Sequence, residues 1–291
     1  MNTHYVYLDG LIVPAAQAAV SVYDVGLLHG ASTFTTLRAH NCKPFRLEAH
    51  LDRLADDVQA LGMDLSFDRR RLADGLAELI EANGLSEARC RITLTPGVAG
   101  EGKPTTLITA DPMPDYPRRW YTEGLVVAVA DQKQLADNPT FGHKTGCYLP
   151  RMLAMRAAAE KGAEEALWYT TENFLAEACM CNVFLVCDDL VLTPPLDTPV
   201  LAGTVRQVVL ELCEQLGIES ANDRRLTVRE MLTASEAFLT GSTTGIRPVV
   251  QIEKHRVGDR KPGPTTSRLI QAYEQLLEQQ CPPSEDADAD S

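Results

Sequence analysis

Phe141-Gly-His-Lys-Thr-Gly-Cys-Tyr-Leu-Pro150 is the stretch around which this chain is organised. One lysine, Lys144, stands there between a glycine-rich approach and an apolar run with helical character, Leu149 to Ala159. It is one of seven lysines in 291 residues, and no carboxylate lies within several positions of it. Desolvation among small and apolar residues lowers a lysine's pKa, so the neutral amine becomes available to form a Schiff base with an aldehyde. The alternative is a lysine that extends from a helix start into water.

Composition and charge exclude several classes of protein. A chain of 291 residues with 45% hydrophobic and 23% charged residues suits one large or two moderate globular domains. Its net charge of −13 argues against a nucleic-acid or anionic-membrane surface. No apolar run approaches the roughly 20 residues of a membrane span. Residues 282–291 carry four carboxylates and no large apolar group, so we expect a disordered acidic tail.

The eight cysteines are expected to be reduced thiols rather than disulfides or metal ligands. Their spacings match no zinc pattern, and no secretory signal precedes them, which predicts a cytoplasmic protein. The pair Cys179 and Cys181 would point to the same side of a strand, but the surrounding sequence supplies no further ligands. We therefore predict no metal site.

Apolar periodicity and turn residues predict an α/β protein with α+β character. Leu47, Leu51, Leu54, Val58 and Leu61 form the apolar stripe of one helix. Other helices are expected at 69–83, 149–161, 206–216 and 265–278. Strands are expected within 5–13 as a hairpin and at 33–37, 91–95, 105–110, 124–130, 165–170, 182–187, 191–193 and 237–240, with 165–170 paired to 182–187. The tight hairpins favour mixed or antiparallel sheets over a doubly wound parallel one.

Three prolines within residues 111–117 mark the start of a linker between two domains. We predict an N-terminal α/β domain at 1–118 and a C-terminal cofactor-binding domain at 134–281. Residues 119–133 would form the linker and the first strand of the second domain.

Two segments have the composition of anion cradles. In Leu201-Ala-Gly-Thr-Val-Arg206, the backbone N–H groups at a helix start favour a phosphate, although Thr204 could equally cap the helix. Gly241-Ser-Thr-Thr-Gly245 follows a strand and gathers hydroxyl and backbone donors, although it could equally be an ordinary turn. Neither matches a nucleotide-binding motif.

Two charged residues in apolar surroundings complete the set. Glu177 lies in an almost uncharged stretch, where a carboxylate needs a cationic partner; a protonated pyridine nitrogen, an arginine or backbone N–H groups would serve. Arg53 stands beside Leu54 and either leans toward the interior or lies on the surface. An aldehyde-capturing lysine, a buried carboxylate, two anion cradles and an arginine together suit pyridoxal phosphate.

Eight segments occur in an order that resembles the fold-type IV (class IV) aminotransferases, which include branched-chain aminotransferases, D-amino acid aminotransferases and 4-amino-4-deoxychorismate lyases. The resemblance covers about Tyr7 to Tyr273. The segments are Asp24-Val-Gly-Leu-Leu-His-Gly30, Phe34-Thr-Thr-Leu-Arg38, Pro44-Phe-Arg-Leu-Glu-Ala-His-Leu-Asp-Arg-Leu54, Lys144-Thr-Gly-Cys-Tyr-Leu-Pro150, Glu177-Ala-Cys-Met-Cys-Asn-Val-Phe184, Gly203-Thr-Val-Arg-Gln207, Phe238-Leu-Thr-Gly-Ser-Thr-Thr-Gly-Ile-Arg-Pro-Val249 and Lys261-Pro-Gly-Pro264.

The resemblance implies a role for each site residue. Lys144 would be the catalytic residue that binds the cofactor aldehyde, and Glu177 would pair with the pyridine nitrogen. The other cofactor contacts would be Arg53 with Thr204, Val205, Ser242 and Thr243 at the phosphate, and Tyr148 at the phenolic oxygen. The family also implies two α/β domains with the cofactor between them, a homodimer, and ping-pong transfer from an amino acid to a 2-oxoacid.

Residues of the substrate pocket leave the branch of the family open. The candidates are Arg38, His29, Phe34, Arg247 and Thr244, with Arg38 and Arg247 as alternative carboxylate clamps. Pro96-Gly97 replaces the Arg-Gly of many members, which argues against the D-amino acid branch, while Phe34-Thr-Thr-Leu37 resembles the lyases as much as the branched-chain enzymes. We expect an aminotransferase of branched-chain type. The alternatives are a lyase, a D-amino acid aminotransferase, or a dimer that binds pyridoxal phosphate without turnover.

Overall fold

Residues 3–283 are described by the computed structural model, so most of the predicted acidic tail lies outside the described residues. These residues form two compact units. The first comprises residues 3–114, Lys144–Cys147 and 276–283, and the second comprises residues 115–143 and 148–275. The segment around Lys144 is thus grouped with the first unit, whereas the sequence assigned it to the second domain. The predicted domain boundaries stay a prediction.

A six-stranded antiparallel sheet forms the centre of the first unit, in the order β2-β1-β6-β5-β3-β4. The predicted N-terminal hairpin is confirmed, and Asp9 and Gly10 at its turn both have positive φ. The strands of this sheet are β1 (Tyr5–Leu8), β2 (Leu11–Pro14), β3 (Thr33–His40), β4 (Lys43–Pro44), β5 (Ala88–Thr95) and β6 (Thr105–Pro112).

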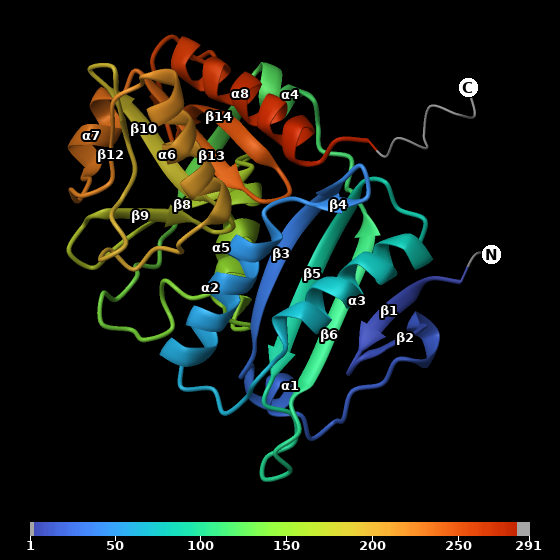
Figure 1. The fold of residues 1–291 in the computed structure, drawn as a ribbon. Coiled ribbons are helices and arrows are strands. Elements are labelled where there is room, and N and C mark those ends of the chain that lie inside the picture. Colours follow the sequence, from blue (N-terminus) through green and yellow to red (C-terminus); the bar gives the residue numbers. More distant parts are fainter. Residues whose placement is uncertain (1–2, 284–291) are drawn as a thin grey trace. The chain divides into compact units, whose positions relative to one another are not determined.

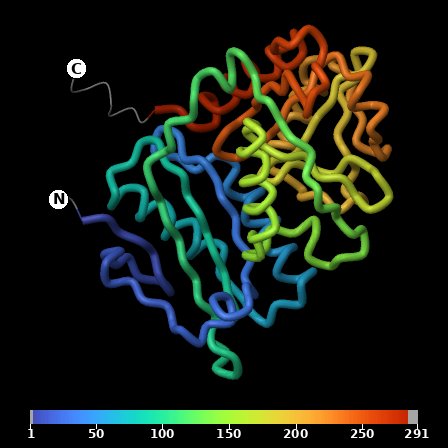
Figure 2. Tube along the Cα trace, turned by 180° about the vertical axis from the view of Figure 1, so that it is seen from behind, coloured from blue at the N-terminus to red at the C-terminus, as the bar shows by residue number. Residues whose placement is uncertain are grey.

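Two amphipathic helices, α2 (Leu47–Ala60) and α3 (Arg69–Ala82), cover one face of this sheet (Figure 1). Their buried leucines pack against the alternate residues Leu37, Ile92 and Ile108 of the strands, as the period of the sequence predicts. Figure 2 shows the same strands from the opposite side, where neither helix lies. The short helices η1 (Ala15–Gln17) and α1 (Val25–His29) precede β3.

The second unit is built on a nine-stranded mixed sheet, in the order β12-β11-β10-β13-β14-β7-β8-β9 with β15 paired to β14. Only the pairs β11–β12, β14–β7 and β7–β8 are parallel, which confirms the predicted mixed sheet. The strands are β7 (Leu125–Val129), β8 (Glu165–Tyr169), β9 (Leu175–Ala178), β10 (Asn182–Cys187), β11 (Leu190–Leu192), β12 (Ser220–Ala221), β13 (Glu236–Gly241), β14 (Gly245–Ile252) and β15 (His255–Arg256).

Helices pack on both faces of this sheet. Ala154 and Ala158 of α5 contact Ala128, Ala166 and Trp168 on one side of β7 and β8. Leu125, Val127 and Leu167 alternate with these residues and belong to a second core cluster that includes Met231 of α7. The helices of this unit are α4 (Arg119–Thr122), α5 (Leu149–Glu160), α6 (Thr204–Leu216), α7 (Val228–Thr233) and α8 (Pro264–Gln280), whose last residues are grouped with the first unit.

One predicted strand pairing is wrong. Strand β8 pairs with β7 and β9, while β10 pairs with β11 and β13, so the expected hairpin of 165–170 with 182–187 does not form. The intervening strand β9 was not predicted because its four residues carry a glutamate and follow directly on a tight turn at Asn173, where φ is +66°. Strand β14, also not predicted, contains Pro248.

None of the helices within residues 3–283 is both long and apolar enough to cross a membrane.

Candidate functional site

The Lys144 segment is held along the beginning of β3 in the first unit. The carbonyl oxygen of Lys144 accepts hydrogen bonds from the Phe34 N–H (2.9 Å) and the Thr33 hydroxyl (3.1 Å). The Lys144 N–H donates to the buried carboxylate of Asp57 at 3.2 Å. Gly146 donates its N–H to the Ser32 carbonyl oxygen at 2.8 Å. The backbone at Lys144 is therefore fixed by strand β3 and helix α2, although it is itself a loop.

The Lys144 side chain is half-buried and lies over an aromatic ring. Its ammonium nitrogen is 4.9 Å from the ring centroid of Phe34, and the Arg91 guanidinium carbon is 3.5 Å from the same centroid. Phe34 is buried, so the ring presents an apolar surface to both cations. The Lys144 side chain is therefore partly removed from water, and its predicted role toward a cofactor stays a prediction.

Arg53 lies on the buried face of α2, in a polar group with Thr35 and His50. Its Nη2 donates to the Thr35 hydroxyl oxygen at 2.8 Å and lies 3.4 Å from His50 Nδ1. The Thr35 hydroxyl is 2.7 Å from the same Nδ1. Because a guanidinium can only donate, Nδ1 accepts, and the imidazole is neutral with its proton on Nε2. Burial lowers the pKa of His50 well below its ordinary value, and the charges of Arg53 and Lys144 lower it further.

Two predicted substrate residues of the first unit lie away from this group. The Arg38 guanidinium forms an ion pair with Glu87 at 2.7 Å, which also contacts His40. Hydrogen bonding and charge from Arg38 and His40 outweigh partial burial and lower the pKa of the Glu87 carboxyl. His29 is exposed at the end of α1. Their substrate roles stay predictions.

Glu177 lies on β9 in the second unit with only 2% of its surface exposed. Its Oε1 accepts from Arg151 Nη2 at 2.5 Å and from Gln134 Nε2 at 3.4 Å, and its Oε2 accepts from the Leu201 N–H at 3.0 Å. An ionised carboxylate offers about four acceptor positions, so Oε2 has room for one further donor. Both partners that the sequence left open beside a pyridine nitrogen, an arginine and a backbone N–H, are therefore present.

Helix α6 begins without a side-chain cap. Thr204 and Val205 are its first residues, and Gly203 at the N-cap makes no side-chain hydrogen bond, so the alternative of a Thr204 cap is wrong. A Cβ at Gly203 would lie 2.0 Å from Asn182 Oδ1, which explains the glycine. The first backbone N–H groups of a 13-residue helix thus have no capping side chain, as an anion site requires.

The second predicted cradle, residues 241–245, contains the turn between β13, which ends at Gly241, and β14, which begins at Gly245. The Thr243 hydroxyl oxygen accepts from the Tyr116 hydroxyl at 3.0 Å, and the Thr244 carbonyl oxygen accepts from Tyr121 at 3.0 Å. The buried hydroxyls of Thr240 and Thr244 make no hydrogen bond within residues 3–283. A bound group with several acceptor oxygens would satisfy such hydroxyls.

The other predicted residues of this unit have partners of their own. Arg247, predicted as a carboxylate clamp, is buried; its Nη2 lies 2.9 Å from Cys181 Sγ and 4.0 Å from the carboxylate of Glu165. Burial raises the pKa of Glu165. Arg247 is therefore a core residue and not the surface-loop arginine that the sequence left as an alternative. Tyr148 is the N-cap of α5, and the centroid of its ring lies 5.8 Å from Cζ of the Arg151 guanidinium.

The structure thus groups Lys144, Arg53 and Phe34 in the first unit. In the second unit one loop connects the surroundings of Glu177 with those of the α6 start. The Leu201 N–H donates to Glu177, and the Leu201 carbonyl oxygen accepts from Asn182 Nδ2 (2.8 Å). Residues that the sequence did not single out are Arg151, Arg91, His50 and Gln134. A signal existed only for Arg151, a cation in the first turn of a helix, where the helix dipole disfavours it.

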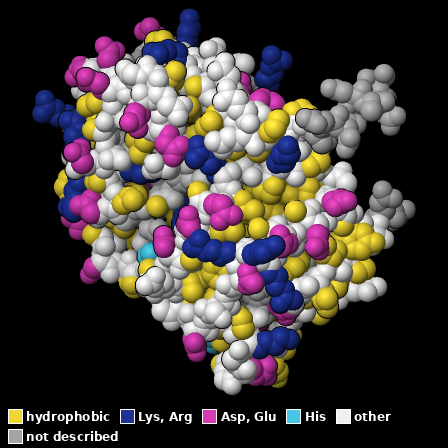
Figure 3. All heavy atoms as spheres, viewed as in Figure 1, with side chains coloured by type: hydrophobic (Ala, Val, Ile, Leu, Met, Phe, Trp, Pro, Cys, Tyr) yellow, Lys and Arg dark blue, Asp and Glu magenta, His cyan; other side chains and the backbone are white. Residues whose placement is uncertain are grey.

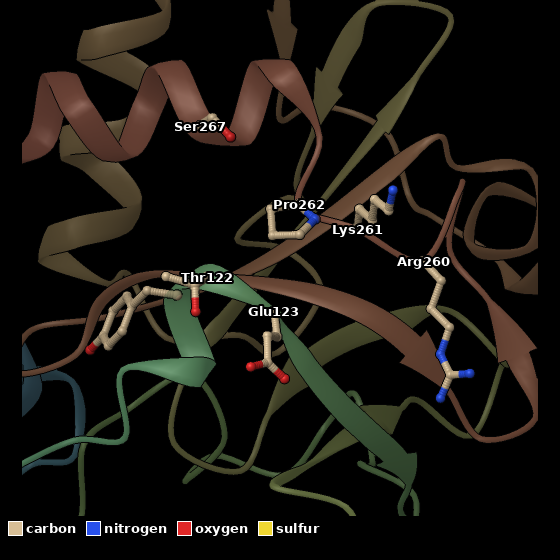
Figure 4. A pocket seen from close by; sticks show the side chains of 7 residues that line it. Thr122, Glu123, Arg260, Lys261, Pro262 and Ser267 are labelled. Atoms are coloured by element: carbon tan, nitrogen blue, oxygen red, sulfur yellow. The ribbon is translucent and has the colours of Figure 1, made fainter.

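A shallow pocket of about 640 Å³ lies elsewhere in the second unit. Figure 4 shows that Lys261 extends away from Thr122, and that the lining side chains do not converge on one point. None of the predicted site residues lines it, so the pocket is not part of the candidate site. Its lining residues are Tyr121, Thr122, Glu123, Arg260, Lys261, Pro262 and Ser267.

Comparison with known proteins finds relatives from one enzyme family along nearly the whole chain. The family described as amino-transferase class IV matches residues 32–252. A Methanocaldococcus jannaschii protein, provisionally named a branched-chain-amino-acid aminotransferase, is 31% identical over 93% of this chain and 96% of its own length. The aminodeoxychorismate lyase of Bacillus subtilis is 27% identical over 94% of each chain.

A solved structure of the Escherichia coli branched-chain amino acid aminotransferase has the same fold. The TM-score is 0.89 at 25% identity, and the match covers 94% of this chain and 95% of that chain. This match confirms the predicted mixed α/β fold with its two sheets. The chain belongs to the class IV aminotransferases, whose cofactor is pyridoxal phosphate.

Proposed function

We propose that this protein transfers the amino group of a small amino acid to a 2-oxoacid, with branched-chain amino acids as the favoured donors. The observation that carries the proposal is the half-buried amine of Lys144 over Phe34, on a backbone that β3 and α2 hold in place. Such an amine is poised to capture the aldehyde of pyridoxal phosphate.

Each remaining part of the cofactor has candidate partners in the chain. The start of α6 at Thr204 and Val205 and the turn at Ser242 and Thr243 offer donors for the phosphate, together with Arg53, and Tyr148 would contact the phenolic oxygen. Glu177 offers Oε2 to the ring nitrogen. When bound, pyridoxal phosphate supplies an aldehyde that takes up the amino group and a ring that accepts electrons.

Lys144 and Glu177 would carry out the proton chemistry. After the amino substrate has displaced it from the cofactor, the Lys144 amine would take the proton from the substrate Cα and deliver it to the aldehyde carbon of the cofactor, so that the amino group would stay with the cofactor. Glu177, as an anion beside the ring nitrogen, stabilises positive charge there. Lys144 is the catalytic residue in this scheme, and Glu177 tunes the acceptor.

The specificity of the pocket has two further candidates in the same family. A lyase that releases pyruvate from aminodeoxychorismate would use the same lysine on another bond, and Phe34-Thr-Thr-Leu37 suits that branch as well. A D-amino acid aminotransferase is disfavoured because Pro96-Gly97 lacks the arginine of that pattern. A protein that binds the cofactor without turnover is the non-enzymatic alternative.

A homodimer is part of the proposal. The segment before β3 exposes Val22, Tyr23, Leu27 and Leu28, with 65%, 69%, 66% and 54% of their surfaces accessible. Apolar side chains gathered at this density on a surface favour a protein contact, and a second copy is the partner that the family suggests.

Basic and acidic side chains are interspersed on the face drawn in Figure 3, which suits small-molecule substrates rather than nucleic acid or membrane. A cytoplasmic location is part of the same proposal.

A visible absorbance scan of the purified protein with pyridoxal phosphate tests the central step. We expect an absorption band from the Schiff base that disappears in Lys144→Ala, and a wild type without the band would overturn the enzyme assignment. Separate incubation with L-leucine or D-alanine plus an oxoacid, and with aminodeoxychorismate alone, identifies the branch. Pyruvate from aminodeoxychorismate without an acceptor would replace the aminotransferase by the lyase.

A further inference from the structure

Arg151 makes three hydrogen bonds to Glu177 and to the two residues that follow it. Its Nη2 donates to Glu177 Oε1 at 2.5 Å, and its Nη1 donates to the carbonyl oxygens of Ala178 (3.1 Å) and Cys179 (2.8 Å). The Arg151 side chain is 16% exposed and that of Glu177 is 3% exposed. One guanidinium therefore holds both the carboxylate and the backbone that follows it.

The position of Arg151 is energetically unfavourable for a cation. Arg151 lies in the first turn of α5, where the helix dipole is positive, and most of its surface is removed from water. Burial alone would lower the pKa of Arg151, but the adjacent Glu177 carboxylate raises it above its ordinary value. The partner that makes the position tenable is thus Glu177, and an apolar side chain would fill the same site of the helix without these costs.

We propose that Arg151 is a positioning residue: it fixes Oε1 of Glu177, and its positive charge favours the proton shared by Glu177 and the cofactor's ring nitrogen on the nitrogen. The inference rests on the proposed function, because it takes Glu177 as the partner of that nitrogen. It adds a role for a residue that the sequence did not single out.

The direction of the effect follows from the geometry of the carboxylate. Arg151 and Gln134 contact Oε1, so the acceptor position that remains is on Oε2. A nitrogen bound there lies farther from the guanidinium than the carboxyl group does. Transfer of the proton from Glu177 to the nitrogen therefore moves positive charge away from Arg151, and Coulomb repulsion favours that transfer.

Without the Arg151 guanidinium, the shared proton would favour Glu177 over the ring nitrogen. Glu177 would be a buried carboxylate whose remaining donors are the Leu201 N–H and the distant Gln134 amide. Desolvation would then favour the carboxylic acid, which donates its proton in a hydrogen bond and leaves the ring nitrogen unprotonated. An unprotonated ring accepts electrons less readily, so amino transfer would slow.

Protonation of the ring can be measured directly. The holoenzyme is reconstituted with pyridoxal phosphate carrying ¹⁵N in the ring, and the ¹⁵N chemical shift is compared with the free cofactor at acid and alkaline pH. We expect the protonated position for the wild type and for Arg151→Lys, which keeps the charge. Arg151→Gln, which keeps N–H donors but loses the charge, should move toward the unprotonated position. Its kcat should fall on the order of 10- to 100-fold, the range for groups that support a primary ligand.

Two further variants separate the possible outcomes. Arg156→Gln removes an exposed arginine of the same helix, paired only with Glu160 in the described structure, and should keep the wild-type shift. If Glu177→Gln moves the ¹⁵N signal and Arg151→Gln does not, Arg151 has only a structural role. The inference about Arg151 then fails, while the proposed function of Glu177 stands. If the wild type binds no cofactor, or Glu177→Gln leaves the signal unchanged, the proposed function of Glu177 fails first.

The measurement does not depend on one variant. If Arg151→Gln does not fold, the shift is followed in Arg151→Lys as pH rises through the titration of the introduced ammonium near about pH 10. We expect the ring nitrogen to lose its proton at lower pH than in the wild type. Coincident titration curves for the two proteins would overturn the inference.

Discussion

Burial of a polar side chain inside the first unit is destabilising unless the side chain has a hydrogen-bond partner. His50, with 1% of its surface exposed, is the clearest case, because its Nδ1 lies within hydrogen-bond distance of the Thr35 hydroxyl and the Arg53 guanidinium. Protonation at Nδ1 would replace an acceptor by a donor that faces Arg53. The imidazole must therefore stay neutral for the fold to keep this arrangement.

The neutral His50 predicts acid sensitivity of the fold. Its folded-state pKa lies below the ordinary value of about 6.5, so the unfolded chain binds the proton more tightly. The stabilising contribution is complete above pH 6.5 and is lost as pH falls below that value, at up to about 1.4 kcal/mol per pH unit. Urea unfolding at pH 7.5, 6.5 and 5.5 measures it, and His50→Gln should show a smaller loss.

The surface residue His4 provides the control for this experiment. His4→Gln removes an exposed histidine whose Nε2 lies 3.5 Å from an Asp111 carboxylate oxygen, and it is the matched histidine-to-glutamine substitution at the surface. Equal slopes for the wild type and His50→Gln would contradict the assignment of a neutral buried imidazole. Carboxylates that titrate in the same range are common to all three proteins and cancel in the comparison.

At the scale of elements, the decisive feature is a loop that behaves as part of a sheet. Residues Lys144–Cys147 lie far from β3 in the sequence, yet Thr145 bridges to Thr33 and Gly146 bonds to Ser32. The approach is close, since a Cβ at Gly146 would lie 2.1 Å from Ser32 Oγ. Any side chain at Gly146, two residues after the lysine, therefore requires the Ser32 hydroxyl to move.

Gly146→Ala should lower the free energy of unfolding by about 1–3 kcal/mol, as expected for overpacking at a tight contact. The double variant with Ser32→Ala removes the clashing oxygen and should recover a large part of this loss. Chemical denaturation of the two single variants and the double variant gives the coupling. Strict additivity of the two substitutions would show that the contact does not limit the segment.

Local patterns predicted the long elements better than the short ones. The period of Leu47, Leu51 and Leu54 places α2 because one apolar stripe suffices to define a helix face. Strand β9 has four residues, all buried, so no alternation marks it. Its neighbours β8 and β10 were predicted correctly as strands but joined wrongly, because pairing depends on the rest of the sheet.

For the whole molecule, the exposed apolar side chains of residues 22–28 predict self-association. Leu27→Asp places a charge among them and should convert a dimer to a monomer in sedimentation velocity at micromolar concentration. Leu196→Asp, at a leucine with 52% exposure in the second unit, is the matched control and should leave the assembly unchanged. A wild type that sediments as a monomer would contradict the predicted dimer.

The sequence by itself determined the family, the mixed α/β class and the candidate residues, because these depend on residue types in a fixed order and on local period. The tertiary structure decided which partner each charge takes: Arg38 pairs with Glu87, Arg247 with Glu165 and Cys181, and Arg151 with Glu177. These partners are far apart in the chain, and their contact follows from strand register and side-chain packing. Desolvation makes a partner necessary for the buried charges of Arg247 and Arg151, since a buried charge without one is strongly destabilising, whereas Arg38 and Glu87 remain partly exposed.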